Sequence, residues 1–284
     1  MGIMNRLTIE KRVQIISALV EGSAINATAR MVGVSKVTIL KLLKDVGEAC
    51  LAFEDKTLRN LTCKNIQCDE IWNFCYAKEK NVPQSKKGQF GFGDVWTWTA
   101  LDADTKLVCS WMVGDRSAAT ANMFMQDLAM RLANRVQITT DGYRPYVQAV
   151  DNAFGINVDY SMLVKLYGND RESEARYSPA ECIGCRKVEI TGNPDPRKVS
   201  TSYVERNNLT LRMQMRRFTR LTNAHSKKIE NMGHALALHF VYYNFCRIHQ
   251  TLRVTPAMEA GIADHVWSIE EIVALLNVHD QQAA

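Results

Sequence analysis

Apolar residues recur at helical spacing through the N-terminal part of the chain and predict three short helices. Thr8 is a suitable N-cap for the first helix, which ends at Gly22. The second helix spans 24–31 and is stopped by Gly33, and Ser35 caps the third. The positions expected to face inward are Ile9, Val13, Ile16, Leu19 and Val20 in the first helix, and Val37, Leu40, Leu43 and Val46 in the third.

The pattern changes to short runs of β-branched and aromatic residues after a charged, amphipathic segment. Such runs cover 66–72, 95–101 and 107–113, and each predicts a strand. The second and third runs are separated by the polar residues 102–106, which suit the turn of a hairpin. A fourth apolar run, 135–140, is also predicted to be a strand.

Helical segments alternate with the later strands. The spacing predicts helices over 118–134 and 145–154, and another helix beginning near Glu205. Between them, 167–200 is polar and contains Pro, Gly and a Cys-x-x-Cys pair, which is typical of an insertion or a flexible excursion. Three antiparallel strands followed by helix–strand units describe an α/β protein with a mixed sheet, the ribonuclease-H-like arrangement.

The connection between the second and third helices favours DNA binding. Ala29, Gly33 and Ile39 have the spacing of a helix-turn-helix unit. The small residue lets two helices approach, glycine permits a left-handed turn, and the branched residue fixes the third helix against the second. The alternative is an ordinary three-helix connection. In a helix-turn-helix unit, the residues free to meet the major groove are Ser35, Lys36, Thr38 and Lys41.

The charge distribution adds a second candidate nucleic-acid surface. The net charge is only +5, but the stretch 206–229 contains seven basic residues and no acid. Such a stretch can follow a phosphate backbone, although a solvated helix face has the same composition. The seven are Arg206, Arg212, Arg216, Arg217, Arg220, Lys227 and Lys228.

Composition restricts the class of protein. No run approaches the roughly 20 apolar residues that span a bilayer, so we expect no membrane association. Eight scattered cysteines suit a reducing compartment, and we expect a cytoplasmic protein, nucleoid-associated if bacterial. Cys182 and Cys185 could bind zinc together with Cys63 and Cys68, but free thiols are favoured because this is not a standard ligand set.

Three acids occupy positions that suit catalysis. Asp69 lies inside the first predicted strand, Asp141 directly follows the fourth, and Glu205 begins a helix. If the first and fourth strands are neighbours, the two aspartates meet at one end of the sheet. Converging carboxylates repel one another unless they bind one or two Mg²⁺ or Mn²⁺ ions. Taken singly, each acid also fits a structural role, as an ion-pair member, a turn residue or a surface residue.

The motifs around these acids resemble those of the Asp-Asp-Glu transposases, closest to the insertion-sequence-one type. They read CDEIW, TTDGY and YVERNNLTLR, and the tail YYNFCRIHQTLRVTPAMEAG is similar to the ends of such enzymes. The resemblance covers 66–261. It implies that Asp69, Asp141 and Glu205 are the catalytic, metal-binding triad, and that Arg212 contacts the transposon end. The 64-residue separation of Asp141 from Glu205 departs from the usual compact spacing, and Glu70 is an alternative to Asp69.

The resulting hypothesis is a DNA transposase that binds terminal inverted repeats, cleaves DNA and joins strands. It has a helix-turn-helix domain over 1–50, a linker over 51–64, a catalytic domain over 65–262 with the insertion at 167–200, and a C-terminal helix over 263–284. We expect Mg²⁺ or Mn²⁺ and no organic cofactor. The expected partners are double-stranded DNA, as transposon ends and target, and further copies of the chain in a homodimer or higher oligomer. The alternatives are an inactive helix-turn-helix regulator and a ribonuclease-H-like nuclease without strand transfer.

Overall fold

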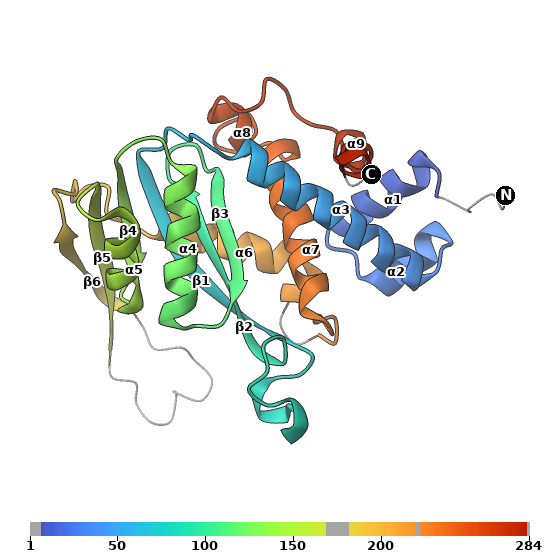
Figure 1. Cartoon of the computed structure of the whole chain (residues 1–284), viewed down its shortest axis with the longest axis horizontal. Helices are drawn as coiled ribbons and strands as arrows, with labels where there is room; N and C mark the ends of the chain where they lie inside the picture. Colours follow the sequence, from blue (N-terminus) through green and yellow to red (C-terminus); the bar gives the residue numbers. More distant parts are fainter. Residues whose placement is uncertain (1–6, 169–181, 220–221, 283–284) are drawn as a thin grey trace.

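A six-stranded mixed sheet forms the centre of the computed structural model, which describes residues 7–168, 182–219 and 222–282 (Figure 1). The strands lie in the order β3-β2-β1-β4-β5-β6. Their bounds are β1 Asn65–Cys75, β2 Gly93–Asp102, β3 Val108–Gly114, β4 Val136–Asp141, β5 Val158–Tyr167 and β6 Cys182–Thr191. The four strands predicted from the sequence are confirmed as β1 to β4.

The pairing of β1 determines the layout of the sheet. It is antiparallel to β2, which forms a hairpin with β3, and parallel to β4 on its other side. β5 is parallel to β4, whereas the edge strand β6 is antiparallel to β5. This order is typical of a ribonuclease-H-like fold, so the predicted mixed α/β sheet is confirmed.

Helices cover both faces of the sheet (Figure 1). On one face lie α4 (Ala118–Arg131) and α5 (Pro145–Phe154), whose Phe124 and Tyr146 pack in one core cluster with Trp98 of β2. The opposite face is covered by α6 (Ser202–Gln214) and α7 (Ile229–Val241). Their apolar residues share a second cluster with β1, β2 and β3, which includes Ile71, Val95, Val108, Val204, Leu211 and Phe240.

The N-terminal part consists of the three expected helices, α1 (Ile9–Val20), α2 (Ile25–Val32) and α3 (Lys36–Thr57). Thr8 and Ser35 cap α1 and α3, and Gly33 ends α2 with a left-handed φ of 68°. Two of the residues that were expected to face inward do not. Ile9 is 61% exposed and Val37 67% exposed. In α3 the buried position is Ile39 instead, one of the three residues that indicated a helix-turn-helix.

Helix α3 is much longer than the sequence predicts. It continues without a break through the residues expected to begin a linker, and ends at Thr57. It packs along α7 and against the C-terminal helix α9 (Ile269–Gln282). At the crossing with α7, Gly47 lies directly against His234. The N-terminal helices are therefore joined to the remainder of the molecule by packing as well as by the chain.

The segment 167–200, expected to be irregular, contributes to the sheet in its described part. β6 pairs with β5 over most of its length, and β5 itself had no counterpart in the sequence analysis. Cys182 and Cys185 lie exposed on this edge strand, whereas Cys63 and Cys68 are buried. A zinc site shared by these four residues is therefore not formed.

The remaining elements are short turns and the tail. They are the 3-10 helices Glu79–Asn81, Gln84–Lys86 and Arg216–Phe218, the π-helix Tyr242–Cys246, and α8 (Pro256–Glu259). Within the described residues, no helix combines the length and the apolar character that crossing a membrane requires.

Candidate active site

Two acids meet at one end of the sheet because β1 and β4 are parallel neighbours. The last paired residues of the two strands are Cys68 and Thr140. Asp69 and Asp141 are the next residues of β1 and β4, so they lie side by side just beyond the last β1–β4 pair. In a parallel pair, residues in register point to the same face. The convergence predicted from the sequence is thus produced by strand register.

A third carboxylate, Glu70, joins this pair. Oxygen atoms of Asp69, Glu70 and Asp141 all lie within 4.8 Å of one another, and no other such cluster of possible metal ligands occurs among the described residues. Burial, Glu70 and Asp141 raise the pKa of Asp69 to about 7. Burial and the charge of Asp141 raise the pKa of Glu70 to about 7. The carboxylates therefore destabilise one another in their charged forms, and their all-oxygen donor set suits Mg²⁺ or Mn²⁺.

The two adjacent acids of β1 face different helices. Glu70 accepts hydrogen bonds from Arg116 Nε at 2.7 Å and from Tyr146 Oη at 3.0 Å, so both of its oxygens have protein partners. Asp69 instead accepts a hydrogen bond from Asn208 Nδ2 at 2.8 Å, on α6. Glu70 thus has a structural counter-ion in Arg116. Asp69 has only a neutral partner and is better placed to hold a metal ion.

The third predicted triad residue, Glu205, lies beside the cluster but outside it. Its Oε1 atom accepts hydrogen bonds from Lys165 Nζ at 2.6 Å and from Thr201 Oγ1 at 2.5 Å. Glu205 is one helical turn before Asn208 on α6, and its charge contributes to the raised pKa of Asp69. The structure therefore brings Glu205 to the same end of the sheet, paired with a lysine.

Several partners of these acids were missed in the sequence analysis. Arg116 lies between β3 and α4, Tyr146 in α5 and Lys165 in β5, and no motif or spacing indicates them. Asn208 was detectable in principle, because residues three apart share one face of a helix.

The predicted DNA-binding residues occupy two regions. Lys36 and Lys41 are exposed on α3, whereas the hydroxyls of Ser35 and Thr38 bond to each other at 2.9 Å in the helix cap. In the basic stretch, Arg206 and Arg216 are exposed, Arg217 is largely enclosed, and Arg212 donates to the Trp72 carbonyl at 3.3 Å. Arg220 lies outside the described residues.

The charge of Asp69 gives a pH prediction. Its folded pKa of about 7 exceeds the ordinary 3.8, so the charged form is penalised by folding. This penalty is absent below the ordinary pKa and grows as pH rises to the folded pKa. We expect the thermal stability of Asp69→Asn relative to wild type to increase as pH rises from about 4 to about 7 in EDTA, since the substitution removes this penalty. Added Mn²⁺ should reduce the difference in unfolding temperature between Asp69→Asn and wild type, because the ion would stabilise the charged form of Asp69. A pH-independent difference between the two unfolding temperatures would contradict this account.

Comparison with known proteins gives similarity to solved transposases at low identity. No protein-family model matches the chain, and no curated protein matches it. The piggyBac transposase synaptic complex with hairpin DNA is 11% identical with a TM-score of 0.43, over 100% of this chain and 75% of that one. The Mos1 transposase paired-end complex with left transposon end is 12% identical with a TM-score of 0.24, over 56% of this chain and 60% of that one. The Mos1 strand transfer complex is 11% identical with a TM-score of 0.25, over 84% of this chain and 77% of that one. Likeness at this level carries no argument about activity, which rests on the acidic site itself.

Proposed function

We propose that the chain is a DNA transposase that cleaves and joins DNA strands at the Asp69–Asp141 site. The observation that supports this most directly is the placement of two aspartates in register on adjacent parallel strands, under a helix that carries Glu205. The closer assignment to the insertion-sequence-one type stays a prediction.

The roles of the protein groups follow from their contacts. Asp69 and Asp141 would hold Mg²⁺ or Mn²⁺, which when bound supplies activation of a water or a DNA 3′-hydroxyl and stabilises the leaving oxygen. Asn208 holds one oxygen of Asp69 and so fixes the direction of the other. The amide of Tyr143 donates to Asp141 Oδ1 at 2.9 Å and limits the rotation of that carboxylate. Tyr146 and Arg116 bond to the two oxygens of Glu70, so this carboxylate beside the pair already has protein partners.

Glu205 would complete the site as a further ligand of the metal ion, in place of its bond to Lys165. We expect Glu205→Gln to lower DNA cleavage at least about a hundredfold, a loss of about 3 kcal/mol, because the amide supplies no charge to the site. Glu70→Gln should stay within about tenfold of wild type, because the oxygens of Glu70 already bond to the protein. Initial rates on one DNA substrate compare the two variants. If Glu70→Gln is the more damaging change, Glu70 and not Glu205 is the third ligand.

DNA recognition would come from the two basic regions. The start of α3, with Lys36 and Lys41 exposed, would enter the major groove as the third helix of a helix-turn-helix unit. The exposed Arg206 and Arg216 would contact phosphates, and Arg212 would contact the transposon end. Two DNA ends must be handled together, so we expect a homodimer or higher oligomer on DNA. Sedimentation of the complex with paired-end DNA tests this, and a strict monomer would contradict it.

A strand-transfer assay tests the proposed activity. Pre-cleaved DNA carrying the terminal repeats that flank the coding sequence is incubated with target DNA and Mg²⁺ or Mn²⁺. Joined products that depend on the metal would support a transposase. Metal-dependent cutting without joining would indicate a ribonuclease-H-like nuclease, and DNA binding without any product would indicate a helix-turn-helix regulator.

A further inference from the structure

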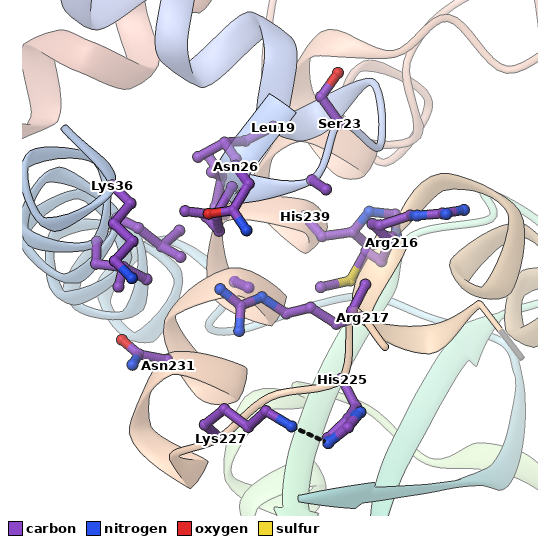
Figure 2. Close-up of a pocket in the computed structure, with 18 of the residues that line it drawn as sticks. Leu19, Ser23, Asn26, Lys36, Arg216, Arg217, His225, Lys227, Asn231 and His239 are labelled. Atoms are coloured by element: carbon purple, nitrogen blue, oxygen red, sulfur yellow. Dashed lines mark hydrogen bonds between the residues drawn. The ribbon is translucent and has the colours of Figure 1, made fainter. Parts of the chain in front are cut away.

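A cavity of about 290 Å³ lies between the N-terminal helices and the segment that joins α6 to α7 (Figure 2). The N-terminal helices supply mainly apolar lining, including Leu19, Val20, Leu40 and Leu43. The opposite side is basic. Among the described residues that line the cavity there is no Asp or Glu, whereas four are Lys36, Arg216, Arg217 and Lys227. Lys36, Arg216 and Lys227 are exposed, so the cost of a buried and unneutralised charge falls on Arg217.

Arg217 is the residue that makes this charge excess unusual. Figure 2 shows its side chain extending into the space between the N-terminal helices and α7. Nη1 donates to Ser226 Oγ at 2.9 Å, whereas Nη2 is buried and has no hydrogen-bond partner. Burial lowers the pKa of this guanidinium to about 10. A largely buried guanidinium with an unbonded donor is the kind of group that binds an oxyanion.

No carboxylate within the described part of the chain neutralises Arg217. Glu48 and Glu230 both act on the nearby His234, yet neither forms an ion pair with the guanidinium. The ammonium of Lys227 contacts His225 Nε2 at 2.5 Å, and it forms no ion pair with an acid of the described residues. That same ring nitrogen is 3.1 Å from the carbonyl oxygen of Tyr76. Two cations therefore line one cavity without a counter-charge from the described residues.

The same groups can be reached from a second direction. A neighbouring cavity of about 450 Å³ is also lined by Arg217, Asn223, His225 and Lys227, together with residues at the end of β1. Arg217 thus stands in a wall shared by two cavities. A ligand in either cavity would therefore lie against the side chain of Arg217.

A solvated basic face does not explain these observations. Arg206 and Arg216 are exposed and keep their hydration, as expected for residues that follow a DNA backbone. The guanidinium of Arg217 is largely buried, and it has one neutral partner, Ser226, while its Nη2 atom has none. We propose that Arg217, with Lys227 beside it, is the centre of a phosphate-binding site between the N-terminal helices and the α6–α7 segment. The phosphate belongs either to the DNA backbone or to a small free phosphate compound. This site would exist whether or not the acidic site cleaves DNA.

Thermal unfolding with inorganic phosphate, against chloride at equal ionic strength, tests the site. Phosphate should raise the unfolding temperature of the wild type by several degrees, because it binds only the folded protein. Arg217→Met should lose this response while folding at least as stably as wild type without phosphate, since an unpaired buried charge is removed. Arg186→Met is the matched control, because Arg186 is exposed on the edge strand β6 and lines neither cavity, and it should respond as wild type does.

A second variant separates binding from folding. Lys227 is exposed, so Lys227→Gln is expected to fold normally and to weaken phosphate binding several-fold. The proposal is overturned if wild type shows no phosphate-specific stabilisation, or if Arg217→Met and wild type respond equally.

Duplex DNA distinguishes the two sources of phosphate. If the occupant is a backbone phosphate, saturating duplex removes the effect of inorganic phosphate. In that case Arg217→Met also makes DNA binding less sensitive to salt. The slope of the logarithm of the binding constant against the logarithm of the salt concentration falls by about one. If the occupant is a free phosphate compound, the inorganic phosphate effect persists in the presence of duplex, and Arg217→Met binds DNA with wild-type affinity.

Discussion

Replacing Asp141 by Asn is expected to abolish metal-dependent cleavage and joining of DNA while leaving the protein folded. The side chain is one of three that converge within 4.8 Å, and it follows a strand that pairs directly with the strand of Asp69. Loss of one charged ligand should remove about 4 kcal/mol of transition-state stabilisation, which lowers the rate about a thousandfold. Initial rates of strand transfer with Mg²⁺ and with Mn²⁺ measure this.

The matched control is Asp151→Asn, which makes the same chemical change at an exposed position on α5. Its rate should equal that of wild type. DNA binding by Asp141→Asn should persist, because the basic residues are unchanged, and this separates a catalytic defect from loss of substrate. Strand transfer by Asp141→Asn within tenfold of wild type would exclude Asp141 from the reaction.

Gly47→Ala is expected to cause the largest loss of stability of any single methyl addition in α3. A Cβ at this position would lie 2.6 Å from the Cα and 2.9 Å from the carbonyl oxygen of His234 in α7. Backbone atoms cannot rotate away, so the two helices must separate. We expect a cost of about 2–3 kcal/mol in the free energy of unfolding, measured by urea denaturation.

Gly233→Ala is the control on the facing helix. This glycine is in α7, beside His234, and a Cβ there would have no neighbour within 4 Å. The substitution should therefore stabilise the protein by about 0.5–1 kcal/mol, because alanine loses less backbone entropy than glycine on folding. If both substitutions destabilise equally, close packing at Gly47 is not the cause.

The elements predicted correctly were those with local signals. Thr8, Gly33 and Ser35 mark helix ends through their own side chains or backbone, and each occupies the expected cap. β1 to β4 were recognised by runs of β-branched and aromatic residues. β6 has no buried position, since it is an edge strand, and its sequence therefore lacks an apolar pattern. Its formation depends on β5, to which it pairs, and not on its own composition.

For the site, the sequence predicted the acids but not their environment. Asp69 was found because an unpaired carboxylate inside an apolar strand is costly, and Asp141 because it directly follows a strand, where the end of a sheet can open onto a crevice. The hydrogen bonds that separate the roles of Asp69 and Glu70 come from Asn208, Arg116 and Tyr146, which lie in three different parts of the chain. Such contacts depend on how helices pack on the sheet, and spacing along the chain does not specify this.

The continuity of α3 has a mechanical consequence for any DNA bound at its N-terminal end. Its 22 residues form a single rigid element between Ser35, at one end, and the crossing with α7 and α9 farther along. An α-helix advances about 1.5 Å and turns about 100° per residue. One inserted residue between Lys41 and Gly47 would therefore swing the basic end about a quarter of a turn around the helix axis. A flexible connection would absorb such an insertion, whereas here the orientation of bound DNA relative to the acidic site depends on the number of residues in one helix.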